Sequence, residues 1–123
     1  MKRILVVDDE LAITRLIKLN LEAAGGYLVF TENKASRAID AARNFQPDLA
    51  LLDIMMPEAL GTDIAAQFQD DPRLRHIKII FLTAIARKGE TDAGHPVGGQ
   101  TIIAKPVTSE ELRSAIDGAL GCA

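Results

Sequence analysis

The apolar residues of this chain fall into five short runs, at residues 4–7, 27–30, 49–52, 79–82 and 101–104. Within these runs apolar and polar side chains do not alternate, and Val, Ile and Leu predominate. Continuous apolar runs of this length are typical of strands that are covered on both faces, as in a parallel sheet between layers of helices. The pattern therefore predicts five buried strands.

The segments 10–24, 34–45 and 62–69 have helical spacing and end near Gly25, Pro47 and Pro72. Thr108 and Glu111 have the spacing of a capping box, which predicts the start of a last helix. The positions expected to face the core of these four helices are Ile13, Leu16, Ile17, Leu19 and Leu21; Ala35, Ala38, Ile39 and Ala42; Ile64, Ala65 and Phe68; and Leu112, Ala115, Ile116, Ala119 and Leu120.

The segment 84–100 does not fit the alternation of strand and helix. It contains four of the nine glycines and one of the five prolines, and both residue types disfavour the interior of a helix. We therefore expect the fourth of five helices to be short or irregular over residues 85–100, with the remainder an irregular loop.

Alternating strands and helices predict an α/β domain with a parallel sheet, and 123 residues suffice for one domain, residues 1–123, without an output domain. A net charge of −3 argues against nucleic-acid binding. No apolar run is long enough to cross a membrane, and Asp8 interrupts the first run too early for a signal peptide. The single cysteine, Cys122, cannot form an intrachain disulfide, so a cytoplasmic location is the default expectation.

Polar side chains follow four of the predicted strands: Asp8 and Asp9, then Asp53, Thr83 and Lys105. The carboxyl ends of parallel strands share one edge of the sheet, and ligands bind in the crevice outside that edge. The second strand is followed by Thr31, Glu32 and Asn33, which do not fit this set. If that strand lies at the border of the sheet, the other four strand ends converge without it.

Three neighbouring carboxylates repel one another, and a single lysine does not balance them. A divalent cation does, and oxygen ligands favour Mg²⁺ or Mn²⁺. A cation, a carboxylate, an ammonium group and a hydroxyl group together suit phosphoryl transfer, in which aspartate can serve as the nucleophile. The strand ends therefore predict an aspartyl-phosphate site.

Four sequence pieces in order resemble the receiver domain of two-component response regulators over essentially the whole chain: residues 4–10, 51–57 with Gly61, 81–84 and 104–106. The resemblance implies a doubly wound sheet with the flavodoxin-like strand order 2-1-3-4-5. It also implies a phosphorylation-dependent signalling switch rather than an enzyme. Pro57 is expected to set a turn, with Gly61 giving the backbone freedom before the third helix.

By this resemblance, Asp53 would be the phosphoacceptor. Asp9, Asp53 and the backbone carbonyl of Met55 would bind Mg²⁺ directly, while Asp8 would act largely through water. The phosphoryl donor would be a phosphohistidine on a sensor histidine kinase or a histidine phosphotransfer protein.

Lys105 would bond to the phosphoryl group, and Thr83 would donate its hydroxyl to that group as the switching contact. The signal would leave through contacts with an unidentified downstream protein. The chain would act as a monomer or a weak dimer.

Three features depart from the family pattern. Ile102 stands where the family often has Tyr or Phe, and no aromatic residue follows Phe81, so readout through an aromatic rotamer is absent. The segment 85–100 puts the usual dimer surface in doubt. Met55 and Ile85 are apolar and cannot orient an attacking water, which predicts slow self-dephosphorylation.

Several other interpretations fit parts of the sequence. Asp8 and Asp9 could simply cap the first helix. A docking module that no longer uses phosphate would also keep this fold. A flavin or nucleotide binder is disfavoured, because the acidic residues 8–10 would repel phosphate in the absence of a metal. A phosphatase acting on other substrates is disfavoured because nothing resembles a substrate-binding cap domain.

Overall fold

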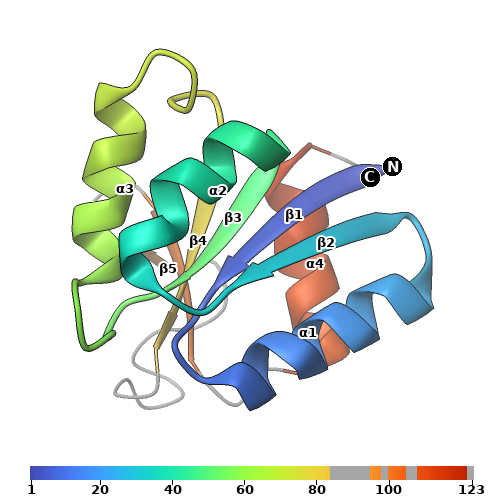
Figure 1. The fold of residues 1–123 in the computed structure, drawn as a ribbon. Helices are drawn as coiled ribbons and strands as arrows, with labels where there is room; N and C mark the ends of the chain where they lie inside the picture. Colours follow the sequence, from blue (N-terminus) through green and yellow to red (C-terminus); the bar gives the residue numbers. More distant parts are fainter. Residues whose placement is uncertain (84–94, 98–99, 105–107, 122–123) are drawn as a thin grey trace.

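Five parallel strands form the centre of the computed structural model, which describes residues 1–83, 95–97, 100–104 and 108–121. These strands are β1 (Lys2–Val7), β2 (Tyr27–Glu32), β3 (Leu49–Asp53), β4 (Lys78–Thr83) and β6 (Gln100–Ala104). They lie in the order β2-β1-β3-β4-β6, and every pair is parallel (Figure 1). The predicted order 2-1-3-4-5 is confirmed.

A sixth strand, β5 (His95–Val97), pairs antiparallel with β6 and forms the other border of the sheet. The sequence predicted an irregular loop here, and that prediction is wrong for these three residues. Pro96 is compatible with a strand at this border, because a border strand has hydrogen bonds on one side only. The rest of the predicted short or irregular fourth helix, residues 84–94 and 98–99, lies outside the described residues.

The described helices begin and end close to the predicted positions. They are α1 (Leu11–Ala24), α2 (Ala38–Phe45), preceded by a 3₁₀ turn (Ala35–Arg37), α3 (Gly61–Asp70) and α4 (Ser109–Ala119). Gly25 ends α1 with φ of 82°, a left-handed conformation that favours glycine. Thr108 accepts a hydrogen bond from the Glu111 amide at 3.1 Å, so the predicted capping box is confirmed.

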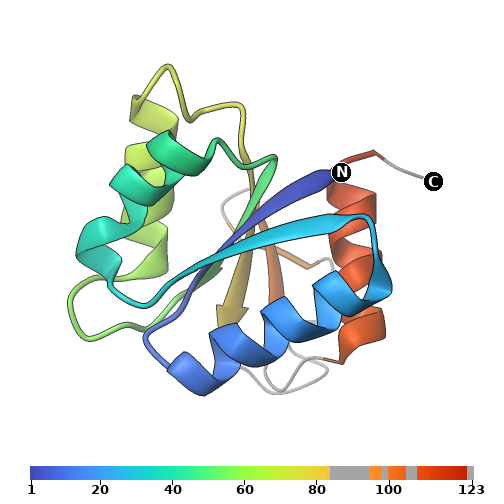
Figure 2. The ribbon, with the colours of Figure 1, turned by 45° about the vertical axis from the view of Figure 1, so that its right-hand side comes forward.

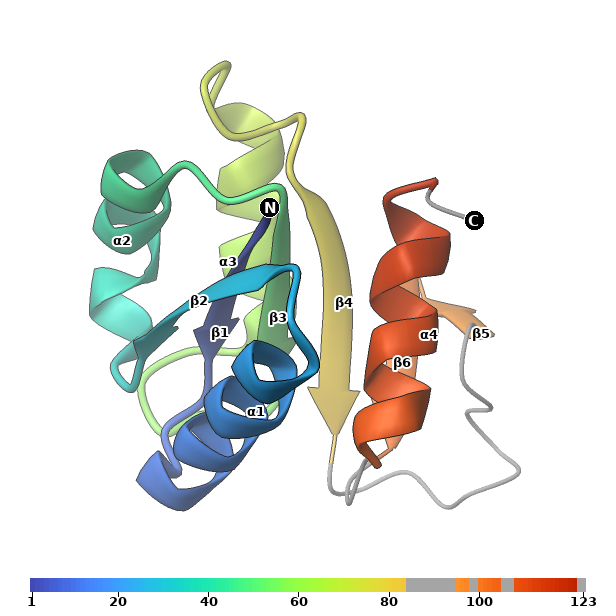
Figure 3. The ribbon, with the colours of Figure 1, turned by 90° about the vertical axis from the view of Figure 1, so that its right-hand side faces the viewer.

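The helices cover both faces of the sheet. Figure 3 shows α2 and α3 on one side of the strands and α1 and α4 on the other, and Figure 2 gives an oblique view of the same layers. Alternate residues of each strand point into opposite layers: Leu5 packs under α2 and α3, whereas Ile4 packs under α1 and α4. Burial on both faces explains the continuous apolar runs.

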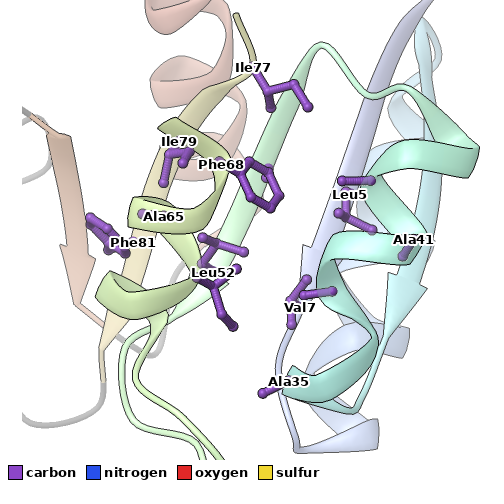
Figure 4. Packing of buried hydrophobic residues seen from close by; sticks show 14 of the residues in the cluster. Leu5, Val7, Ala35, Ala41, Leu52, Ala65, Phe68, Ile77, Ile79 and Phe81 are labelled. Atoms are coloured by element: carbon purple, nitrogen blue, oxygen red, sulfur yellow. The ribbon is translucent and has the colours of Figure 1, made fainter. Parts of the chain in front are cut away.

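The layer beneath α2 and α3 combines large strand side chains with small helical ones. Phe68 of α3 is fully buried among the strand residues Leu52 and Ile79, whereas α2 contributes only alanines at its closest approach (Figure 4). Alanine brings the α2 backbone close to the sheet.

The broad apolar stripe predicted for α1 is partly wrong. Leu16 and Leu19 are 53% and 67% exposed, and the fully inward positions of this helix are Thr14, Ile17 and Leu21. These three are spaced by three and four residues, which is the width of contact that one sheet face offers a helix. Among the described residues, none of the helices is long and apolar enough to cross a membrane.

Candidate functional site

Three acidic side chains come together at the carboxyl edge of the sheet. Asp8 and Asp9 directly follow β1, and Asp53 is the last residue of the neighbouring strand β3. One carboxylate oxygen from each lies within 4.8 Å of the others. Asp8 is fully buried and Asp53 is 4% exposed, whereas Asp9 is exposed. The fold thus assembles the acidic cluster that the sequence predicted.

Asp8 is held at several points. Its amide donates to the Glu32 carbonyl at 3.1 Å, and its carboxylate oxygen Oδ1 accepts from the amide of Glu10 at 2.9 Å. Glu10 is the residue that precedes the first turn of α1, and its own side chain makes no capping hydrogen bond. The Asp8 carboxylate thus bonds to the residue before the helix rather than to an amide of its first turn.

Asp53 is positioned by the close approach of α3. The amide of Gly61, the first residue of α3, donates to the Ile54 carbonyl at 2.8 Å. A Cβ on Gly61 would lie 2.4 Å from the carbonyl oxygen of Asp53. The sequence singled out Gly61 for backbone freedom, but the structure gives a different reason, since what this position needs is space against the Asp53 backbone.

Thr83 ends β4, next to β3, and is 4% exposed. It is in register with Ala104, the last residue of β6, so these two strands end at the same sheet edge. Lys105, predicted to contact the phosphoryl group, lies outside the described residues, as does Ile85. Met55 lies in the loop after β3, is 53% exposed, and forms an isolated antiparallel bridge with Leu60. The role of its backbone carbonyl stays a prediction.

Ile102 stands where receiver domains often have Tyr or Phe. Its side chain is 4% exposed and packs in the layer beneath α2 and α3. It is in register with Phe81 of β4. A side chain buried in this way fills the core rather than presenting a surface to a partner.

The sequence did not identify Asn33 as part of this edge. The end of the second strand, residues 31–33, was not expected to join the other four strand ends at this edge. In the structure, the Asn33 side chain donates a hydrogen bond to the Asp8 carbonyl at 2.9 Å. Its position directly after a strand was the only signal in the sequence.

The donor set fits a hard divalent cation. Asp8, Asp9 and Asp53 offer only carboxylate oxygens, which Mg²⁺ and Mn²⁺ prefer, and two of the three side chains are buried. Burying carboxylates side by side requires a compensating positive charge. These three residues are the described groups that could hold such an ion.

Comparison with known proteins agrees with this geometry. Residues 4–117 match the family described as response regulator receiver domain. The polar-differentiation response regulator DivK of Brucella anthropi is 34% identical over 120 residues, covering 98% of this chain and 97% of that protein.

Solved structures give the same result. A receiver domain protein described as CheY-like from Methanospirillum hungatei is 30% identical, with a TM-score of 0.82 and coverage of 98% of this chain and 94% of that one. A receiver domain protein from Clostridium thermocellum is 28% identical, also with a TM-score of 0.82, and covers 98% and 95%. The chain therefore belongs to the response regulator receiver domain family, the phosphoacceptor signalling modules that histidine kinases serve.

Proposed function

We propose that Asp53 accepts the phosphoryl group and that this chain acts as a switch that signals through protein contacts. The observation that carries the assignment is the placement of Asp53. Its carboxylate is buried at the end of β3, yet it lies within 4.8 Å of the carboxylates of Asp8 and Asp9. Burial of an acidic group beside two others is costly unless the site serves a charged ligand.

The chemistry follows from the side chains. An aspartate carboxylate is ionised near neutral pH, so it needs no base to act as a nucleophile. One oxygen of Asp53 would bond to phosphorus while the bond from phosphorus to the donor histidine nitrogen breaks, and that nitrogen keeps the electron pair. Hydrolysis of the acyl phosphate would later return free phosphate and the carboxylate.

The cation site would consist of Asp8, Asp9, Asp53 and the backbone carbonyl of Met55, with Mg²⁺ or Mn²⁺ as the ion. The bound ion would neutralise negative charge on the phosphoryl oxygens during transfer. Asp8 would contribute mainly through water, since its Oδ1 already accepts the Glu10 amide.

Thr83 and Lys105 would contact the phosphoryl oxygens, the first with its hydroxyl and the second with its ammonium group. Thr83 fits this role by position, because it is buried at the end of the strand next to Asp53. Lys105 lies outside the described residues, and its position in the sequence directly after β6 supports this role. Movement of Thr83 toward the phosphoryl group would start the signal.

The donor would be a phosphohistidine on a sensor histidine kinase or a histidine phosphotransfer protein. Three exposed apolar side chains belong to the segments that follow β1 and β3: Leu11 at 48%, Met55 at 53% and Leu60 at 41%. Exposed apolar side chains close in sequence to the acidic residues suit a protein donor better than a small molecule. We place this exchange in the cytoplasm, where ATP supplies phosphoryl groups to kinases.

The signal would leave without an aromatic switch residue, because that position holds Ile102. Its side chain is buried in the core. A small shift of the backbone after β4 would carry the signal to an unidentified downstream protein, with the chain a monomer or a weak dimer.

The side chains of Met55 and Ile85 cannot orient an attacking water by a hydrogen bond, so we expect slow self-dephosphorylation. Replacing Met55 by Asn and Ile85 by Glu should shorten the phosphate lifetime, and an unchanged lifetime would contradict this account.

The test is incubation with acetyl phosphate and Mg²⁺, followed by intact mass analysis. Wild type should gain one phosphoryl group, and Asp53→Asn should gain none. Asp40→Asn is the matched control, because the Asp40 side chain is 77% exposed on α2 and is not one of the clustered carboxylates. No gain in wild type, with Mg²⁺ or Mn²⁺, would remove the proposal and favour a docking module that does not use phosphate.

A further inference from the structure

Asn33 connects three elements that meet behind the acidic cluster. It follows β2, and its side-chain nitrogen Nδ2 donates to two acceptors, the carbonyl oxygen of Asp8 and the hydroxyl oxygen of Thr14, both at 2.9 Å. Thr14 is fully buried, and its hydroxyl donates to the Leu11 carbonyl at 3.1 Å. One amide group thus joins the end of β2 to the loop after β1 and to the first turn of α1.

The hydrogen bonds fix which way the amide of Asn33 points. The Asp8 carbonyl can only accept a hydrogen bond, and the single Thr14 hydroxyl proton is already given to Leu11. Both neighbours therefore require donors, and the NH₂ group of Asn33 supplies both. A carboxylate of the same shape would place an oxygen against the Asp8 carbonyl oxygen, and the Thr14 hydroxyl could donate to it only by giving up its bond to Leu11.

The Asp8 carbonyl belongs to the peptide group that joins Asp8 to Asp9. The opposite end of the Asp8 backbone, its amide, donates to Glu32 of β2 at 3.1 Å. The backbone of Asp8 is therefore held on both sides by residues from the end of β2. Asp9 is exposed, so the direction of its carboxylate depends mainly on this peptide.

We propose that Asn33 is a positioning residue of the phosphorylation site. By fixing the peptide between Asp8 and Asp9, it orients both carboxylates for the divalent cation. This inference rests on the proposed function, since it concerns the same cation site. Mg²⁺ requires near-ideal octahedral geometry, and residues that orient metal ligands commonly change metal affinity by about 10–100-fold when removed.

The experiment uses Asn33→Ala in the full chain with two measurements. Mn²⁺ binding, followed by electron paramagnetic resonance without any phosphoryl donor, should weaken about tenfold or more. The Mg²⁺ concentration that gives half-maximal phosphorylation by acetyl phosphate should rise by a similar factor. The rate at saturating Mg²⁺ should stay within about twofold of wild type, because excess cation restores the occupied site.

Two further variants and one control separate positioning from simple stabilisation. Thr14→Val removes the hydroxyl at nearly constant volume and leaves the Asn33 bond to Asp8, so it should lower Tm with little change in Mn²⁺ affinity. Asn33→Asp adds a negative charge that would by itself attract the cation. It should nevertheless weaken Mn²⁺ binding, because the donor to the Asp8 carbonyl is lost. Asn44→Ala, at an exposed position of α2, should leave Mn²⁺ binding unchanged.

The outcomes distinguish the two proposals. Wild-type Mn²⁺ affinity in Asn33→Ala, or tighter binding in Asn33→Asp, would overturn the positioning role. The same loss of affinity in Thr14→Val as in Asn33→Ala would also overturn it, because the effect would then follow the stability of the fold. A wild-type chain that neither binds Mn²⁺ nor takes up a phosphoryl group would instead refute the proposed function.

Discussion

Gly61 is the position where adding one methyl group should disturb both the fold and the site. A Cβ at this residue would lie 2.4 Å from the carbonyl oxygen of Asp53, 3.0 Å from its carbonyl carbon and 3.1 Å from the Cα of Ile54. All three are backbone atoms, so no side chain can rotate away from the new methyl group. Ordinary contact distances require the methyl group and the Asp53 peptide to separate by about 1 Å.

The size of the effect follows from this overlap. Forcing a methyl group into a packed region costs about 1–3 kcal/mol, and an alanine in the first turn of a helix recovers about 0.5–1 kcal/mol relative to glycine. We therefore expect Gly61→Ala to lower the free energy of unfolding by about 1–2 kcal/mol, or Tm by about 4–8 °C for a chain of this length. Since the displaced peptide carries Asp53, phosphorylation should slow by about 10–100-fold.

Gly118→Ala is the matched control. Gly118 lies in α4, and a Cβ there would meet no atom within 4 Å. The same substitution should then raise stability by about 0.5–1 kcal/mol through helix propensity alone and leave phosphorylation unchanged. Thermal denaturation and an intact-mass time course with acetyl phosphate measure both effects. A Gly61→Ala variant with the wild-type Tm and phosphorylation rate would refute the steric reasoning.

Three other substitutions test local features of the fold. A hydrogen bond from the Val29 amide and a weaker contribution from the Lys18 side chain hold the pKa of Glu22 below its usual 4.5. The ionised carboxylate therefore stabilises the fold above that pH, and this stabilisation is lost as pH falls through the lowered pKa. In denaturant titrations, the stability advantage of wild type over Glu22→Gln should be constant above about pH 5 and disappear in acid. Gln46 has φ of 53°, so Gln46→Gly should raise the free energy of unfolding by about 0.5–1 kcal/mol, and an unchanged denaturation midpoint would contradict this. Thr108→Ala removes the capping box of α4 and should lower Tm, at a cost of about 1 kcal/mol.

The fold could be predicted from the sequence because burial on both faces leaves a local mark. Ile4 and Leu5 point into opposite layers, yet both must be apolar, and each parallel strand repeats this requirement. Once the sheet is parallel, Asp8 and Asp53 must share an edge whatever the details of the connections. The acidic cluster is thus a consequence of topology, which is why it could be predicted without coordinates.

The strand β5 could not be predicted, because it depends on pairing with β6 and not on the residues of β5 itself. His95 and Pro96 carry no strand signal of their own, and the surrounding glycines favour a loop. The strand forms because the outer edge of β6 offers hydrogen bonds to it. Asn33 was missed for a related reason: its partner Asp8 lies 25 residues away, and a sequence shows a donor without showing which acceptor it meets.

The partly wrong prediction for the apolar stripe of α1 has a further cause at the border of the sheet. The strand β2 has β1 on one side only, so the backbone groups on its other side need partners or water. At Val29 those partners come from α1: Lys18 donates to the carbonyl at 2.8 Å, and Glu22 accepts from the amide at 3.1 Å. The same two side chains form an ion pair at 3.1 Å. Lys18 and Glu22 of α1 therefore bond to part of the β2 edge, in addition to the contact that the apolar side chains of this helix make with the sheet. The spacing of the leucines indicates only the second of these contacts.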